Sequence, residues 1–198
     1  MQYFKSIPKV IYTDQNGSSI RTNLLARVSI VPQSLKSPML YYKYDIQEGD
    51  TPEIIAHKYY NDMYRYWIVL FSNEMLDPQW SWPLNYNQFT AYINDKYGPT
   101  DVYSTIHHYE KTITQYDTKT YTTTTNTIQI DEQVYNSLVE TSNTYSLPTG
   151  EVNVQITKKS VSLYEYELAL NESKRSINLL NSRYIDEIET QFLKLMNK

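Results

Sequence analysis

The chain has 198 residues, of which 40% are hydrophobic and 20% charged, with 21 tyrosines, no cysteine and a formal net charge of -4. Lysine and arginine are scattered along it, which argues against nucleic acid and membrane surfaces as partners. The lack of cysteine excludes disulfides and thiolate metal sites and fits a reducing cytoplasm.

The surplus of tyrosine has two interpretations. It is typical of Tyr-rich strands, and equally of contact surfaces for protein or sugar. No stretch is apolar for the length of a signal peptide or a membrane helix, so we expect no export by the ordinary secretory route.

Residues 1–40 are expected to form an extended N-terminal arm that leans on other structure. They carry three prolines, a turn signal DQNGSS at Asp14–Ser19, and the run NLLARVSIV, which fits either a helical turn or a strand.

Residues 41–98 are dense in aromatic side chains and are the expected core domain with a Trp-rich extension. Alternation from Tyr42 to Ile46 predicts a strand. Thr51 followed by Pro52 predicts the start of a helix, with Thr51 as the N-cap. A second helix is predicted over residues 63–72, with Trp67, Leu70 and Phe71 on its buried face, and Asn73 is expected to end it in a left-handed conformation.

Trp80 and Trp82 stand beside prolines, so we expect them in an irregular loop. There they either pack over the domain, contact a protein partner or stack on a glycan.

Residues 99–160 are predicted to form a β-rich segment. The stretch from Thr112 to Ile130 is mostly β-branched and tyrosine residues, which favours exposed strands, with a flexible Thr-rich loop as the alternative. Val152, Val154 and Ile156 alternate as a strand, so a hairpin or small sheet is expected.

Residues 161–198 lack glycine and proline from Ser162 onward and predict one long C-terminal helix. Its apolar residues form two stripes, and we expect at least one to pack on a partner, with a hairpin against the N-terminal arm as the alternative. Glu172 and Arg175 fit either a solvated ion pair or a buried polar pair at a helix–helix joint. The candidate partner contacts are Trp80, Trp82, Tyr164, Leu168, Glu172, Arg175, Ile177, Leu180, Tyr184 and Ile188.

No constellation of an enzyme is visible, so we expect no catalytic site, cofactor or metal. His107 and His108 are adjacent in a predicted strand, where neighbouring side chains point to opposite faces and do not share a metal. Glu48, Asp50 and Glu53 imitate a paired-carboxylate glycosidase site, but a turn and a helix N-terminus attract carboxylates by themselves.

From Tyr44 to Asn73 the pattern is a strand, then GDTPEIIA, then YYND, then an aromatic helix. The residues of this pattern are Tyr44, Ile46, Gly49, Asp50, Thr51, Ile55, Ala56, Tyr59, Trp67 and Asn73. In these residues the stretch resembles the LysM module. The resemblance implies a strand–helix–helix–strand core that holds N-acetylglucosamine polymers between the loop after the first strand and the loop before the second. This chain departs from the pattern after Asn73, where EMLDPQWSWPL replaces the second strand.

Ordered pieces along most of the chain, among them YFKSIPKVIY, the GDTPEIIA region through SWPL, and YEYELALNESKRSINLL, resemble the small LysM-containing baseplate wedge proteins of contractile-tailed bacteriophages. That resemblance implies a structural virion subunit, assembled in the host cytoplasm, that binds neighbouring wedge and tail proteins and helps join wedges into a ring around the hub. The expected fold is α+β: a LysM-like core, an extended arm, a β-rich insert and a long C-terminal helix. The alternative function is a LysM module that binds peptidoglycan or chitin-type glycans, which the altered second loop makes the weaker expectation.

Overall fold

The computed structural model of the chain describes residues 3–15, 17–24, 39–148 and 150–196. It is a mixed α+β structure, in agreement with the expected class. The chain divides into two compact units, which are described separately. Unit 1 takes the residues up to Tyr86 together with those from Glu172 onward, and unit 2 takes Asn87–Asn171.

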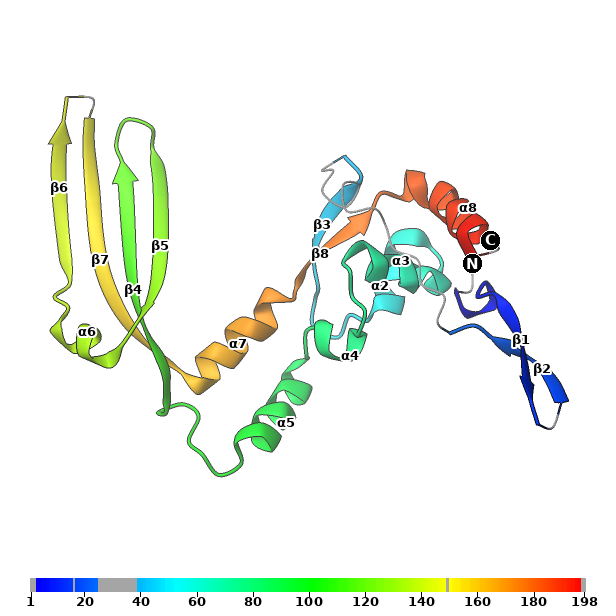
Figure 1. Ribbon diagram of the computed structural model, residues 1–198. Coiled ribbons are helices and arrows are strands. Elements are labelled where there is room, and N and C mark those ends of the chain that lie inside the picture. Colours follow the sequence, from blue (N-terminus) through cyan, green and yellow to red (C-terminus); the bar gives the residue numbers. More distant parts are fainter. Residues whose placement is uncertain (1–2, 16, 25–38, 149, 197–198) are drawn as a thin grey trace. The chain divides into compact units, whose positions relative to one another are not determined.

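Unit 1 is built around a two-stranded antiparallel sheet whose strands are far apart in the sequence. Strand β3 (Tyr41–Asp45) pairs with β8 (Ser176–Leu180), so that Tyr41 lies opposite Leu180. Helix α2 (Pro52–Tyr60), the 3-10 turn η2 (Met63–Arg65) and helix α3 (Tyr66–Ser72) follow β3 directly. The sheet is completed only about a hundred residues after α3 ends (Figure 1).

The two helices begin and end at residues suited to these positions. Thr51 accepts a 3.3 Å hydrogen bond from the backbone N–H of Ile54, which confirms it as the N-cap of α2. Asn61 ends α2 with a φ of 54°, in the left-handed region. Asn73 follows α3 as expected, but its φ of -114° shows that the left-handed conformation expected there is wrong, and Glu74 takes the left-handed conformation instead.

The core of unit 1 lies between the helices and the sheet. Helix α2 contributes Ile55 and Ala56, and strand β8 contributes Ile177, Leu179 and Leu180, all at most 2% exposed. Helix α3 is buried more broadly than expected: Trp67, Ile68 and Val69 are buried, while Leu70 and Phe71 are half-buried. Burial of this kind contributes about 1.5–3 kcal/mol for each large apolar side chain.

The expected single C-terminal helix is wrong. Helix α7 (Leu163–Ser173) ends before β8, and the chain continues through the 3-10 turn η3 (Ser182–Tyr184) into helix α8 (Ile185–Met196). Pairing with β3 satisfies the backbone of residues 176–180 and buries their apolar side chains, which outweighs their helix propensity. Phe192 of α8 packs against Trp67, with ring centroids 4.8 Å apart.

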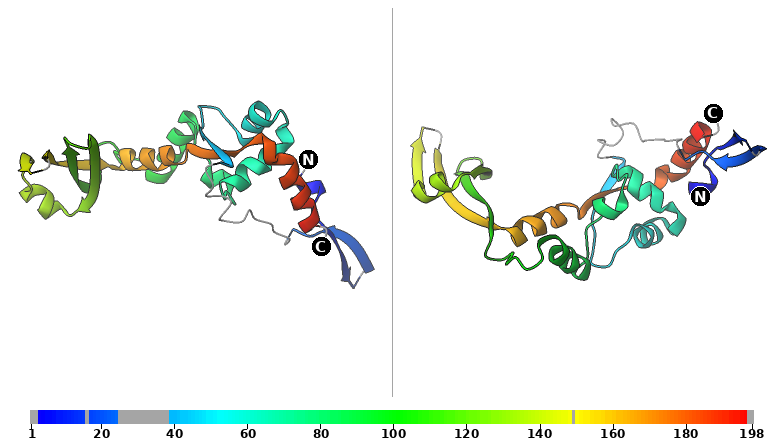
Figure 2. Two further views of the ribbon diagram at one scale, coloured as in Figure 1. Left: turned by 90° about the horizontal axis from the view of Figure 1, so that it is seen from above. Right: turned by 60° about the horizontal axis from the view of Figure 1, so that its bottom comes forward.

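The N-terminal arm contains the 3-10 turn η1 (Tyr3–Lys5) and a hairpin of β1 (Lys9–Asp14) and β2 (Gly17–Thr22). Tyr3 packs into the aromatic cluster of Trp67, Phe71 and Phe192. Every described residue of the hairpin strands is exposed, and the two strands project from the rest of unit 1 in each view of Figure 2. Most of the run NLLARVSIV, from residue 25 on, lies outside the described residues.

Unit 2 contains a four-stranded antiparallel sheet in the order β5-β4-β7-β6. The strands are β4 (Ile106–Asp117), β5 (Thr122–Ile130), β6 (Thr141–Leu147) and β7 (Gly150–Ser162), and helix α6 (Glu132–Ser137) joins β5 to β6. The Thr-rich stretch is therefore strand rather than loop. In the same unit, α5 (Tyr86–Tyr97) packs against α7, with the ring centroids of Phe89 and Tyr164 5.7 Å apart.

The two units do not coincide with the segments ending at residues 40, 98 and 160 that the sequence suggests. Helix α5 from the expected core domain and helix α7 from the expected C-terminal segment both belong largely to unit 2. No helix in the described part of the chain has the length and apolar character needed to cross a membrane.

Candidate functional site

The turn between β3 and α2 is the most highly organised polar site of unit 1. The backbone N–H of Asp50 donates to the carbonyl of Gln47 at 3.0 Å, which closes a tight turn. Gly49, at the third position of this turn, has a φ of 83°, a conformation that favours glycine. The glycine of the GDTPEIIA motif is thus required by the backbone of the turn.

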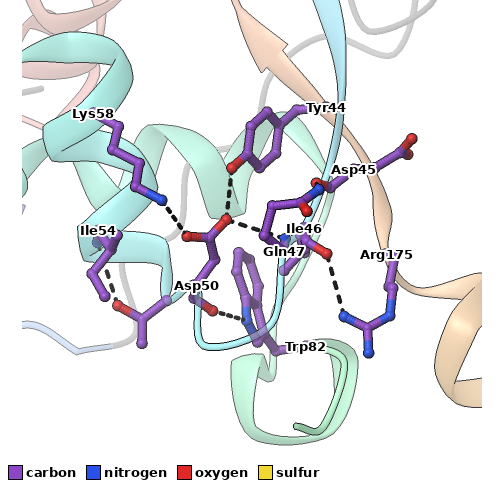
Figure 3. A network of polar contacts seen from close by, with 10 residues as sticks. Tyr44, Asp45, Ile46, Gln47, Asp50, Ile54, Lys58, Trp82 and Arg175 are labelled. Atoms are coloured by element: carbon purple, nitrogen blue, oxygen red, sulfur yellow. Dashed lines mark hydrogen bonds and ion pairs between the residues drawn. The ribbon is translucent and has the colours of Figure 1, made fainter.

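The Asp50 carboxylate holds this turn and the adjoining elements together (Figure 3). One oxygen accepts from the Tyr44 hydroxyl at 2.6 Å and from the Gln47 backbone N–H at 3.1 Å, and the other accepts from Lys58 Nζ at 2.6 Å. Asp50 is 8% exposed, and its donors come from β3, the turn and α2. A buried carboxylate with three donors is a structural junction.

The electrostatics of Asp50 follow from these contacts. Burial raises the pKa of its carboxyl group, but the hydrogen bonds from Lys58, Tyr44 and Gln47 outweigh that effect and hold the pKa below its usual value. The hydrogen bond that the Tyr44 hydroxyl donates to Asp50, together with burial, raises the pKa of Tyr44 to about 12. Asp50 is therefore charged and fully bonded at neutral pH, which suits a fixed structural anion and not a general acid.

The outer side of the same turn is bonded to segments that come after α3. Trp82 Nε1 donates to the Asp50 carbonyl at 3.0 Å, and Arg175 Nη1 donates to the Ile46 carbonyl at 3.3 Å. The backbone N–H of Tyr86 donates to the Glu48 carboxylate at 2.8 Å. Backbone and side-chain groups around the turn are thus occupied by the chain itself.

Asn73 joins α3 to β8. Its side-chain N–H₂ donates to the carbonyls of Val69 and Asn178 at 2.8 and 2.9 Å, and its side-chain oxygen accepts from the Asn178 backbone N–H at 2.7 Å. The amide of Asn73 thereby pairs with β8 as a neighbouring strand would. This contact gives the motif asparagine a role that is independent of left-handed backbone.

The remaining motif residues are mostly part of the core. Ile46, Ile55, Ala56 and Trp67 are buried, and Thr51 caps α2. Tyr59 is partly exposed, with its ring 6.2 Å from that of Tyr42 and 5.2 Å from that of Tyr60.

Most of the side chains expected to contact a partner are instead packed within the chain. Ile177 and Leu180 are at most 2% exposed, so a partner contact at these two positions is wrong. Tyr184 and Ile188 are half-buried against the same core, and their contact with a partner stays a prediction. The physical reason is that β8 and α8 turn these residues toward α3, which a continuous helix would not do.

The other expected partner contacts divide between packing and exposure. Tyr164 packs against Phe89 and Tyr103 within unit 2, and Leu168 is half-buried. Glu172 and Arg175 form a partly exposed ion pair at 2.6 Å, and Arg175 lies in the link between helix α7 and strand β8.

The two tryptophans of DPQWSWPL have different environments. Helix α4 (Pro78–Ser81) replaces the expected irregular loop around Trp80, which is 63% exposed. Trp82 is half-buried, packs against the core of unit 1 and uses its indole N–H in the turn. Of the two rings, Trp80 is the one available to a partner.

A second buried carboxylate, which the sequence did not indicate, joins α5 to α7 in unit 2. Glu167 is 4% exposed and accepts from Lys96 Nζ at 2.6 Å and from the hydroxyls of Tyr97 and Tyr92 at 2.7 and 3.2 Å. Burial raises its pKa, but the bonds from Lys96 and Tyr97 outweigh this and lower it. A carboxylate one helical turn after Tyr164 was the available signal.

The expected geometry of His107 and His108 is wrong. A bulge in β4 between Ile106 and His108 interrupts the alternation, and the two Nδ1 atoms lie 2.8 Å apart. His107 stacks on Tyr166 at 3.8 Å, and His108 Nε2 lies 3.1 Å from a Glu110 carboxylate oxygen. Within the described residues, no group of three or more His, Asp or Glu side chains has the arrangement of a metal site.

Together, the described residues around the turn form a rigid support with few free polar groups. Comparison of the sequence with protein-family models gives no match, and comparison with curated proteins gives none either.

Proposed function

We propose that this chain is a non-catalytic structural subunit of a contractile-tail baseplate wedge. In this role it binds neighbouring wedge and tail proteins, helps join wedges into a ring around the hub, and becomes part of the virion tail in the host cytoplasm. The ordered sequence resemblance along most of the chain is the reason for naming this assembly.

We also propose that unit 1 is a LysM-like core. The order of β3, α2, α3 and β8 supports this, because it is the strand–helix–helix–strand order that the resemblance implies. The bonds of Asn73 to Asn178 support it further, since they join the end of the second helix to the second strand. The residues between α3 and β8 would then be an insertion into the module.

One observation favours a structural role over sugar binding: hydrogen-bonding groups of the turn after β3 are already bonded to other parts of the chain. In LysM modules this turn and the loop before the second strand hold the glycan. Here the Asp50 and Ile46 carbonyls accept from Trp82 and Arg175, both of which belong to the inserted segment or its end. A glycan at this place would have to break these contacts and desolvate charged groups without replacing their partners.

The N-terminal hairpin supports binding to other proteins. Ile11 and Ile20 lie directly opposite each other in β1 and β2, and they are 75% and 72% exposed. An isolated two-stranded hairpin is marginally stable in water, and this one presents an apolar pair to solvent. Such an arm is suited to folding onto a neighbouring subunit.

The proposal is tested by using the full chain as bait in a lysate of cells that are assembling contractile tails, with captured proteins identified by mass spectrometry. A parallel sample is sedimented with purified peptidoglycan. We expect baseplate proteins in the capture and no retention by the cell wall. The role of the arm is tested with the double variant Ile11→Asn and Ile20→Asn, which alters this exposed pair and leaves the core intact.

We expect the arm variant to capture at least about tenfold less baseplate protein than the wild type, which is the typical effect of removing an apolar anchor. Retention by peptidoglycan together with the absence of baseplate proteins would overturn the proposal in favour of the glycan-binding alternative.

A further inference from the structure

The sheet of unit 2 has two chemically different faces. Because side chains alternate along a strand and directly paired residues share a face, the register assigns each residue to one side. One side, here called the apolar face, carries Ile113, Ile128, Tyr145, Val152, Val154 and Ile156. The same register also places polar residues among them: Gln115, Asn126, Asn143 and Lys158. The opposite side, the polar face, carries threonine, serine, glutamine and charged side chains from the same strands.

The apolar face is covered only at one end. Helix α6 lies over the end where β4 begins, with the rings of Tyr109 and Tyr135 4.4 Å apart and Lys158 Nζ bonded to the Tyr135 carbonyl at 2.7 Å. Farther along the strands, Ile128 and Tyr145 are 45% and 53% exposed, and Val152 and Val154 are half-buried. An antiparallel sheet with one apolar and one polar face normally packs its apolar face against another layer.

Charges mark the two ends of this face. Lys111 lies on it near α6, beside Lys158 of β7. Asp117 lies on it at the far end of β4, where one of its carboxylate oxygens accepts from the backbone N–H groups of Lys119 and Thr120. Six residues separate Lys111 from Asp117, which is about 20 Å along a strand. Consider a second copy whose sheet is stacked on this face and is related to the first by a twofold axis. The axis lies in the plane between the sheets and runs across the strands, so the strands of the two copies run in opposite directions. Each Lys111 then meets the Asp117 of the other copy.

The area agrees with such a pair. Four strands about 4.8 Å apart, each contributing about eight residues at about 3.4 Å, give roughly 500 Å² of flat surface on each copy. Two copies would bury about 1,000 Å² in all, near the lower limit for a specific interface. The polar faces would then be directed to solvent on both sides, as in a β-sandwich.

We propose that the apolar face of unit 2 is a self-association surface, on which two copies of this chain stack their sheets with the strands reversed. The interface is isologous, so β4 packs over β4 and β7 over β7, with Val154 close to the twofold axis. This inference does not depend on the role in a tail baseplate.

Sedimentation equilibrium of the purified full chain tests the proposal, with Val154→Asp compared with Gln155→Asp. The two positions are adjacent in β7 and lie on opposite faces, so the substitutions add the same charge to the same strand. We expect a wild-type dimer with a dissociation constant on the order of 10 μM. Val154→Asp should weaken it more than about tenfold, and Gln155→Asp by less than about twofold.

The charge arrangement is tested with Lys111→Met and Lys111→Glu. The methionine variant removes an attraction, whereas the glutamate variant places like charges opposite each other, so the second should weaken the dimer more than the first. A chain that is monomeric at roughly 500 μM would overturn the proposal. So would a dimer that is indifferent to Val154→Asp, because a different surface would then hold it.

Cross-linking decides the matter if Val154→Asp fails to fold, which its circular dichroism would reveal. The chain has no cysteine, so a short bismaleimide reacts only with a cysteine that is introduced. Gln115→Cys lies on the apolar face and Thr114→Cys on the polar face of the same strand. We expect covalent dimers from Gln115→Cys alone, and equal yields from the two variants would contradict the proposed stacking.

Discussion

The side-chain amide of Asn73 pairs with both the backbone N–H and the backbone carbonyl of Asn178, 105 residues farther along the chain. This one side chain therefore sets the position of β8 against α3, and with it the closure of the sheet around the core of unit 1. The segment between α3 and β8 therefore begins and ends close to this contact.

Replacing Asn73 with alanine should lower the free energy of unfolding by about 2–4 kcal/mol, because three hydrogen bonds are lost and backbone groups of β8 are left without a partner. Urea unfolding at neutral pH measures this loss. Asn178→Ala is the matched control, since Asn178 contributes its backbone and not its side chain to the contact. Equal losses in the two variants would contradict the assigned role.

The stability of unit 1 should fall in acid because of Asp50. A carboxyl group whose pKa is lower in the folded state contributes stability above the unfolded pKa of about 4 and loses it as the pH falls through the folded value. Asp50→Asn should therefore be less stable than the wild type at pH 7, with a difference that shrinks between about pH 4 and the folded pKa. Urea midpoints across this range, with the exposed Asp45→Asn as control, measure the effect, and a constant difference would refute it.

Glu167→Gln should loosen unit 2 alone. The substitution removes the charge that faces Lys96 in a nearly buried position, where the loss of one member of an ion pair is costly. Hydrogen exchange should increase in α5 and α7 and remain unchanged in α3 and β8. Glu172→Gln, a nearby and exposed substitution, should leave hydrogen exchange unchanged in all four elements. A uniform increase in hydrogen exchange across both units for Glu167→Gln would show that the effect of this contact is not local.

Ser72→Ala should leave the stability unchanged or raise it by up to about 1 kcal/mol. The Ser72 hydroxyl is buried, and its oxygen has no hydrogen-bond partner among the described residues. Alanine removes that unsatisfied group and has a higher helix propensity. Thr51→Ala, which removes a used N-cap, should cost about 1 kcal/mol in the same thermal unfolding series. A larger loss for Ser72→Ala than for Thr51→Ala would contradict this view.

The elements that the sequence predicted well are those with local signals. Thr51 and Pro52 mark the start of α2, and the alternation of Val152, Val154 and Ile156 marks β7, because capping and side-chain periodicity depend on neighbours in the sequence. The existence of strands in the Thr-rich segment followed from the same kind of argument.

The errors arose where distant residues decide the structure. The run Ile177–Leu180 fits a helix by propensity, and only its pairing with β3, more than 130 residues earlier, makes it a strand. The apolar residues of this region are spaced three or four apart, as in a helix, and this spacing concealed the strand, although Leu179, which is buried, did not fit it. Similarly, the bulge at His107 that brings two imidazoles together leaves no mark in the sequence.

The most direct test of the central claim is to purify intact contractile tails from producing cells on a density gradient and to quantify this chain in each fraction by mass spectrometry. The proposed role predicts that the chain follows the tail through the gradient at a fixed ratio to a tail-tube protein. A chain that is absent from the tail fractions and recovered with the cell-wall fraction would contradict it.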